Sequence, residues 1–153
     1  MITRSDRGTR WVVAQMILIG VVAAIAPWYR GHWPVTVSLL PAALLFAWAA
    51  WTGVTGVRDL GRNLTPMPSP KPGGSLVTSG IYARLRHPLY SSLMALGFAW
   101  ALAWSSLPAV AFAAALALLL HAKARHEELQ LAQTFPDYPA YMSRVPRYLP
   151  RLR

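Results

Sequence analysis

The stretch LYSSLMALGFAWALAWSSLPAVAFAAALALLLH, residues 89–121, decides the fold. It holds two apolar runs of 16 and 15 residues, and only Ser105 and Ser106 separate them. Two helices joined by so short a turn lie antiparallel. Pro108 is tolerated in the first turn of the second helix, where its missing N–H needs no replacement. The stretch therefore predicts a helical hairpin that crosses a lipid bilayer.

Two further apolar segments precede this hairpin. Residues 11–28 and 35–57 carry no charged side chain and are 18 and 23 residues long, which suits helices that span a bilayer core of about 30 Å. We therefore expect an all-α polytopic membrane protein, one domain over residues 1–153, with four transmembrane helices at 11–28, 35–57, 88–104 and 107–122. A cleaved signal peptide is the alternative for the first segment. We favour an uncleaved helix, because cleavage would place the later basic segments on opposite sides of the membrane.

Composition excludes several other classes of protein. Of the 153 residues, 55% are hydrophobic and 13% are charged, and the net charge is +10. So much hydrophobicity excludes a disordered basic segment and argues against a small soluble nucleic-acid binder, so we expect no nucleic-acid partner. The chain has no cysteine, which excludes a disulfide framework, a thiolate zinc site and a cysteine nucleophile. We expect no metal site.

The basic residues predict the orientation. Fourteen of the 15 lysines and arginines lie before the first span, between the second and third, or after the fourth, and Arg30 is the exception. With four spans these segments share one side of the membrane, and basic loops stay in the cytoplasm. We therefore expect both termini in the cytoplasm, in the inner membrane if the source is bacterial. Membrane lipids would be partners of this basic surface, and the oligomeric state stays open.

The entrance of the third span combines several residue types that bind ligands. Arg86 and His87 precede Pro88, with Tyr82 and Tyr90 on either side. The first N–H groups of a helix and its dipole favour an anion such as a carboxylate. Residues of these types also gather at membrane interfaces without binding a ligand. For the set as a whole we favour a binding site.

An adjacent acidic pair follows the fourth helix, which we expect to continue through Ala132. Glu127 and Glu128 are two of only five acidic residues in the chain. Successive helical residues point about 100° apart, so at least one of the two can face a cation. That cation is either a ligand or a basic side chain, with Lys123 and Arg84 as the candidates.

Two segments outside the helices are also expected on the cytoplasmic side. The loop 58–80 carries prolines at 66, 68, 70 and 72 and then two glycines, a composition that predicts extended backbone and turns. Its 23 residues exceed what a simple connection needs, which favours a functional loop. The aromatic and basic tail, residues 135–150, by itself predicts a segment lying on the membrane. Closure of a pocket by this tail is the alternative.

Taken together, these residues match a known family. The segments LGRNLTP (60–66), LVTSGIY (76–82), RHPLY (86–90), EE (127–128) and YPAYMSRVPRYLP (138–150) follow one another around the helical hairpin. In this order they resemble the superfamily of isoprenylcysteine carboxyl methyltransferases and phospholipid methyltransferases. The resemblance implies an S-adenosylmethionine-dependent methyltransferase whose loop and tail, within residues 59–150, form the cofactor pocket. The acceptor would be lipophilic, such as an isoprenylcysteine carboxylate, a lipid amine or a thiol.

The resemblance also implies a role for individual residues. It implies that Arg86, His87 and Glu127 are catalytic. It also implies that Lys123 and Arg86 contact the acceptor. Cofactor contacts are implied for Gly74, Ser75, Leu76, Val77, Gly80, Tyr82, His87, Pro88, Leu89, Tyr90, Glu127 and Glu128. This set suits the cofactor's chemistry, because acids attract its ammonium, N–H groups its carboxylate, and tyrosines its sulfonium or adenine.

The chain departs from the family pattern in two places. Ser92 stands where the family commonly has glycine, and Phe135-Pro136-Asp137-Tyr138 replaces a longer acidic motif. These departures leave open a second hypothesis, a non-catalytic membrane protein that retains the fold. A transporter is disfavoured, because the spans hold almost no ionisable residue. The identity of the acceptor, and methylation at O, N or S, stay open as well.

Overall fold

The computed structural model describes residues 8–151, and every structural statement here refers to that part of the chain. Arg4, Arg7 and Arg153, which contributed to the predicted orientation, lie outside it. The described residues form five α-helices and two short 3-10 helices, and no strand, so the prediction of an all-α protein is confirmed. The helices are α1 (Thr9–Trp28), α2 (Val35–Leu60), η2 (Gly61–Asn63), η3 (Gly80–Ala83), α3 (Pro88–Ala103), α4 (Leu107–Thr134) and α5 (Tyr138–Arg144).

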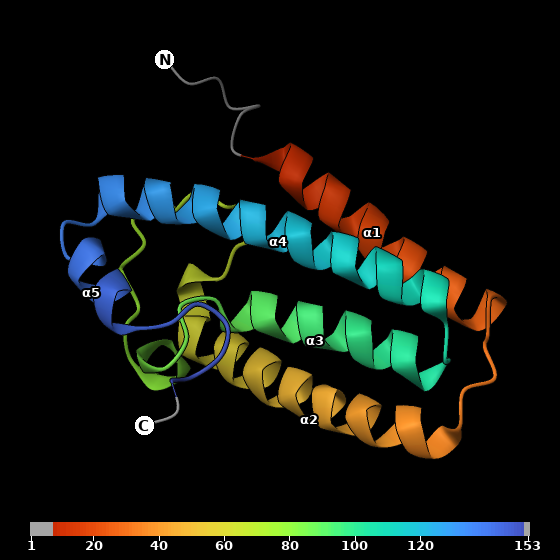
Figure 1. Ribbon diagram of the computed structural model, residues 1–153. Coiled ribbons are helices and arrows are strands. Elements are labelled where there is room, and N and C mark those ends of the chain that lie inside the picture. Colours follow the sequence, from red (N-terminus) through yellow and green to blue (C-terminus); the bar gives the residue numbers. More distant parts are fainter. Residues whose placement is uncertain (1–7, 152–153) are drawn as a thin grey trace.

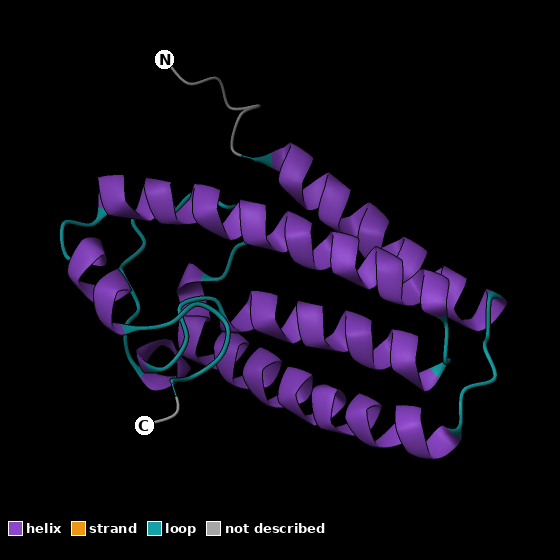
Figure 2. Cartoon of the chain, viewed as in Figure 1, coloured by secondary structure: helices purple, strands orange, loops and turns teal. Residues whose placement is uncertain are grey.

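Helix α3 is the centre of the bundle. It packs along α2 on one side and contacts α4 and α1 on the other, while α1 packs chiefly on α4 (Figure 1). The long helices lie side by side, and the loop between α2 and α3 gathers with α5 and the tail at one end of the bundle, whereas the α1–α2 and α3–α4 connections lie at the other end (Figure 2). The residues that the sequence singled out as functional all come to this end.

The surface of the bundle is typical of a membrane protein. Small residues fill the helix contacts, as where Gly97 of α3 lies against Ala113 of α4, whereas large side chains such as Leu40, Leu44 and Phe46 of α2 are exposed. Small residues at the contacts and large apolar residues outside are the pattern of helices packed in lipid. Three helices, α1, α2 with its extension, and α4, are long and apolar enough to cross a membrane.

The number of spans stays a prediction. Helix α3 has 16 residues, about 24 Å of helix, and is shorter than the other three long helices. Its partner in the hairpin, α4, has 28 residues and runs to Thr134, so its continuation beyond the apolar stretch is confirmed. The two helices differ in length because α4 continues past the level at which α3 begins.

The turn between α3 and α4 is the predicted one. Helix α3 ends at Ala103, with Trp104 as its C-cap, and α4 begins after Ser106, whose Oγ accepts a hydrogen bond from the N–H of Ala109. This is the serine N-cap that helices favour. Ser105 takes a left-handed conformation with φ of 51° in the short reversal between the two helices.

Ser92 contacts helix α2. Its Oγ donates a hydrogen bond to the carbonyl of Ala49 at 2.7 Å, and Gly53 of α2 lies opposite it. A Cβ at Gly53 would come within 2.7 Å of Ser92 Oγ. The absent side chain at position 53 therefore makes room for the extra side chain at position 92, and this departure from the family pattern is accommodated in the α2–α3 contact.

Candidate functional site

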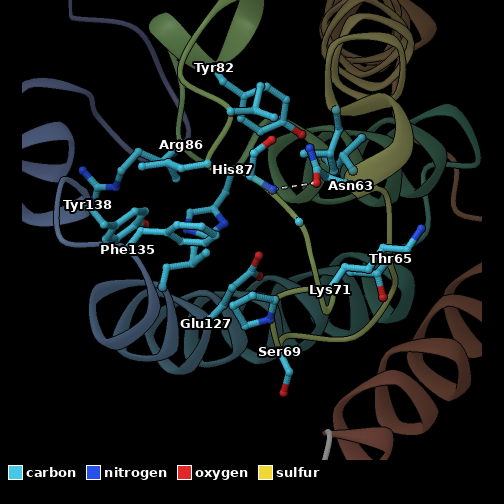
Figure 3. Close-up of a pocket in the computed structure, with 18 of the residues that line it drawn as sticks. Asn63, Thr65, Ser69, Lys71, Tyr82, Arg86, His87, Glu127, Phe135 and Tyr138 are labelled. Carbon is cyan, nitrogen blue, oxygen red and sulfur yellow. Dashed lines mark hydrogen bonds between the residues drawn. The ribbon is translucent and has the colours of Figure 1, made fainter.

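A pocket opens at the end of the bundle where the loops gather (Figure 3). Its volume, counted together with the open space at its mouth, is about 850 Å³. Eleven of the residues expected in the site line it: Gly74, Ser75, Leu76, Val77, Tyr82, Arg86, His87, Pro88, Leu89, Tyr90 and Glu127. These residues come from the loop, η3, the start of α3 and the distal part of α4.

Other residues of the lining were not singled out individually from the sequence. Most come from segments that were recognised only as segments, the proline-rich loop and the aromatic tail. They are Leu60, Asn63, Thr65, Met67, Ser69, Pro70, Lys71, Leu131, Phe135, Tyr138 and Tyr141. The motif LGRNLTP and the tail aromatics were the available signals for them.

The loop is shaped around Gly74. The N–H of Ser75 donates to Asn63 Oδ1 at 3.1 Å (Figure 3), and the N–H of Gly74 donates to the carbonyl of Lys71 at 2.8 Å. A Cβ at Gly74 would come within 2.9 Å of both of these acceptor oxygens. Glycine is therefore required at this close approach, which sets Ser75 and its neighbours against the pocket.

The first turn of α3 presents two unused donors. The N–H groups of Arg86 and His87 donate to the carbonyls of Pro146 and Arg147 at 2.9 and 3.0 Å, so the tail occupies these positions. The next two N–H groups, those of Leu89 and Tyr90, have no hydrogen-bond acceptor among the described residues. Both residues line the pocket. The N–H groups that stay free at this helix start are therefore those of Leu89 and Tyr90, and not those before Pro88.

Glu127 is the acid of the pocket. Its Oε2 accepts a hydrogen bond from the hydroxyl of Tyr90 at 2.7 Å, and the Tyr90 ring stacks on His87 with 5.2 Å between centroids. No ion pair joins Glu127 to a basic side chain within residues 8–151. A carboxylate held only by a neutral hydroxyl keeps its charge available for a cationic ligand.

Glu128 has a different environment from its neighbour. It is 5% exposed and accepts from three basic side chains: Arg86 at 2.9 Å, His87 at 3.1 Å and Arg147 at 2.6 Å. We call this group, Glu128 with Arg86, His87 and Arg147, the Glu128 clasp. Burial by itself raises the pKa of Glu128, but the donors of His87, Arg147 and Arg86 outweigh it and hold that pKa below its usual range.

The clasp fastens the tail over the entrance of α3. Nη1 of Arg86 donates to the carbonyls of Met142, at 2.8 Å, and Val145, so the Arg86 guanidinium is engaged within the protein. The Tyr141 hydroxyl donates to the Tyr82 carbonyl at 2.6 Å, and burial raises the pKa of Tyr141 to about 12, which keeps this donor protonated. The tail therefore packs into the site instead of lying free on the membrane.

Three expected site residues do not line the pocket: Gly80, Lys123 and Glu128. Gly80 has φ of 60°, and a Cβ there would collide with the Asp59 carboxylate, which accepts the N–H of Ile81 at 2.8 Å. Its role is thus to bring η3 onto the end of α2. Lys123 is 1% exposed and contacts Gln15 and Pro66. Arg84, considered as a partner of the acids, takes no part in the clasp.

Comparison with known proteins gives a family and two relatives. A sequence model of the family described as phospholipid methyltransferase matches residues 37–137. The cobalt-zinc-cadmium resistance protein CzcN of Cupriavidus metallidurans is 33% identical over 137 residues, which cover 80% of this chain and 63% of that protein. The nickel-cobalt-cadmium resistance protein NccN of Alcaligenes xylosoxydans xylosoxydans is 31% identical over 156 residues, 99% of this chain and 67% of that protein.

The chain is thus shorter than both relatives, spanning less than two thirds of the first and about two thirds of the second. Among the described residues, no group of three or more His, Asp or Glu side chains is placed to hold a metal ion. The matched segment, residues 37–137, contains α2 except its first two residues, the loop, α3 and α4. It leaves out α1 and the part of the tail that forms the clasp.

Proposed function

The chain belongs to the phospholipid methyltransferase family, and from this premise we propose that it transfers a methyl group from S-adenosylmethionine to a lipophilic acceptor at the cytosolic face of the membrane. One observation carries the proposal. Glu127, which has no basic partner in the described part of the chain, lines the same pocket as Leu89 and Tyr90, whose N–H groups are free. The acceptor is an isoprenylcysteine-like carboxylate, a lipid amine or a thiol.

The lining fits the cofactor group by group. Glu127 would hold the ammonium or a ribose hydroxyl, and the N–H groups of Leu89 and Tyr90 would hold the carboxylate, as helix N-termini do. The rings of Tyr82 and Phe135, both in the lining, offer faces for the adenine or the cationic sulfur. When bound, the cofactor supplies a methyl group on a positively charged sulfur.

The protein's own part is to bind, align and exclude water. Holding donor and acceptor in line can supply most of the acceleration, and the fastened tail covers the pocket from one side. Arg86 and His87 act through Glu128, since the clasp engages both. A carboxylate acceptor needs no base. An amine or a thiol must lose a proton, and the carboxylate of Glu127 is the group in the pocket lining that can accept it as a base.

The names of the two relatives describe resistance to metal ions, and the proposal for this chain rests instead on the pocket and the family. The direct test uses the purified protein in detergent with S-adenosylmethionine labelled in the methyl group and a total membrane lipid extract. We expect saturable binding of the cofactor and one labelled lipid product. Binding without any product would favour the non-catalytic alternative, and no binding would refute the proposal.

We further propose four spans with both termini in the cytoplasm, in the inner membrane if the source is bacterial. Because the chain has no cysteine, a single introduced cysteine reports its own location. In intact cells, a membrane-impermeant maleimide should label Leu107→Cys, at the exposed start of α4. It should label Ser143→Cys, on α5, only after permeabilisation. The reverse pattern, or equal labelling of both sites in intact cells, would contradict the topology.

A further inference from the structure

Lys123 is a charged side chain in a buried position. It lies on α4 one turn before Glu127 and is 1% exposed. Its Nζ donates to Gln15 Oε1 of α1 at 2.8 Å and to the carbonyl of Pro66 at 2.9 Å, and it lies 5.3 Å from the centre of the Tyr90 ring. A buried ammonium is costly unless such bonds satisfy it. These two hydrogen bonds therefore bind three segments of the chain firmly together.

The loop segment that receives one of these bonds makes few bonds of its own. Its prolines at 66, 68 and 70 have no N–H to donate. Within the structure described, the bonds of residues 64–70 to one another or to η2 are local, such as that from the N–H of Met67 to Thr65 Oγ1 at 3.2 Å. The bond from Lys123 is the one that joins this segment to a long helix. Thr65 and Met67, on either side of Pro66, line the pocket.

Helix α1 supports the same segment at a second point. Gly8, at the start of α1, has φ of 87°, and a Cβ there would collide with the ring of Pro68. The side chain of Pro68 is among the most completely buried in the protein. Helix α1 therefore contacts the loop directly at Gly8 and indirectly through Gln15 and Lys123, although it lies outside the segment matched by the family.

We propose that Lys123 is a positioning residue, and that α1 and Lys123 together hold residues 65–69 in place as one wall of the pocket. Lys123 thus acts through the loop instead of touching the acceptor. The positioning of the wall follows from the contacts themselves, whereas its effect on cofactor affinity rests on the proposed function. Affinity for S-adenosylmethionine would then depend on α1, a helix that the family pattern does not require.

The experiment uses a cysteine at Ser69 as a reporter of the wall, since the chain has no other cysteine. In detergent, Lys123→Met should raise the rate at which a soluble maleimide labels Ser69→Cys roughly tenfold, because both bonds are lost. Gln15→Leu should raise it by a smaller factor, and Gln15→Glu should keep it low, because a carboxylate also accepts from Lys123. Arg125→Met, an exposed neighbour on α4 without a hydrogen bond in the described structure, is the matched control.

Two further measurements separate the explanations. Ser143→Cys on α5 should be labelled at the same rate with and without Lys123→Met. If both reporters respond to Lys123→Met, the whole fold has loosened. In that case Gln15→Leu tests the proposal, which requires faster labelling of Ser69→Cys and not of Ser143→Cys. In the chain without reporters, Lys123→Met should weaken S-adenosylmethionine binding by about the factor seen in labelling. Unchanged labelling and cofactor affinity, with slower methyl transfer to lipid extract, would overturn the proposal and place Lys123 at the acceptor. If the unaltered chain binds no cofactor, the proposed function fails, and the labelling rates still decide whether Lys123 holds the wall.

Discussion

The Glu127→Gln variant is expected to bind S-adenosylmethionine about 100-fold more weakly than the unaltered protein, the effect of losing one hydrogen bond to a charged group in a pocket. Glutamine keeps the size of the side chain and an oxygen that can still accept from the Tyr90 hydroxyl, which donates at 2.7 Å. Only the negative charge is removed. Since Glu127 is the one acid in the pocket lining, no other described carboxylate is placed to replace it.

Calorimetry or filter binding in detergent measures the effect, and Asp137→Asn is the matched control. Asp137 stands at the start of α5, makes no capping hydrogen bond and is absent from the pocket lining. The control should bind like the unaltered protein, and the thermal midpoints of both variants should stay close to the original. A Glu127→Gln protein that binds the cofactor normally would show that the pocket has been assigned to the wrong ligand.

The Glu128→Ala variant is expected to lower the thermal midpoint by roughly 10 °C. Removing one partner of a buried ion pair costs about 3–5 kcal/mol, and for a chain of this size each kcal/mol corresponds to about 2–4 °C. Here the loss leaves Arg86 and Arg147 without their acid. Because these two arginines fasten the tail, the variant should also be cleaved by trypsin within residues 144–151 much faster than the unaltered protein.

Arg144→Ala provides the control for this variant, since Arg144 is exposed and donates only to a carbonyl of its own helix. It should shift the midpoint by no more than a degree or two. The pH dependence adds an independent check. The pKa of Glu128 is depressed below its usual 4.5, so its stabilisation is present above pH 4.5 and is lost as the pH falls below it. The difference between the unaltered protein and Glu128→Ala should therefore shrink in acid, and a constant difference would argue against the clasp.

Much of the helical architecture could be predicted because its causes are local. The apolar runs set the helices, and the serine pair at 105 and 106 and the proline at 88 set where they turn and begin. The predictions were less accurate where a boundary depends on another segment. Helix α2 continues to Leu60, beyond the predicted end at 57, and there Asp59 accepts the N–H of Ile81 from 22 residues away.

The sequence could indicate which residues lie together at the candidate site, but not how each of them is used. Residue types and their order indicated the entrance of α3 and the acidic pair, and the structure brings most of them to one pocket. The roles of Glu127 and Glu128 could not be separated in this way. They differ by one position, and a rotation of about 100° directs one to the pocket and the other to three basic side chains, two just before α3 and one in the tail.

By itself, then, the sequence determined an all-α fold with helices long and apolar enough to cross a membrane, because apolar length acts within a segment, and it indicated the polar residues near one helix entrance. Only the tertiary structure decided which polar groups form hydrogen bonds within the protein and which stay free for a ligand. Lys123 finds its two acceptors 108 and 57 residues away, and the tail reaches back to occupy the donors of Arg86 and His87. A buried polar group takes whichever partner the packing brings within reach, and no local pattern specifies that partner.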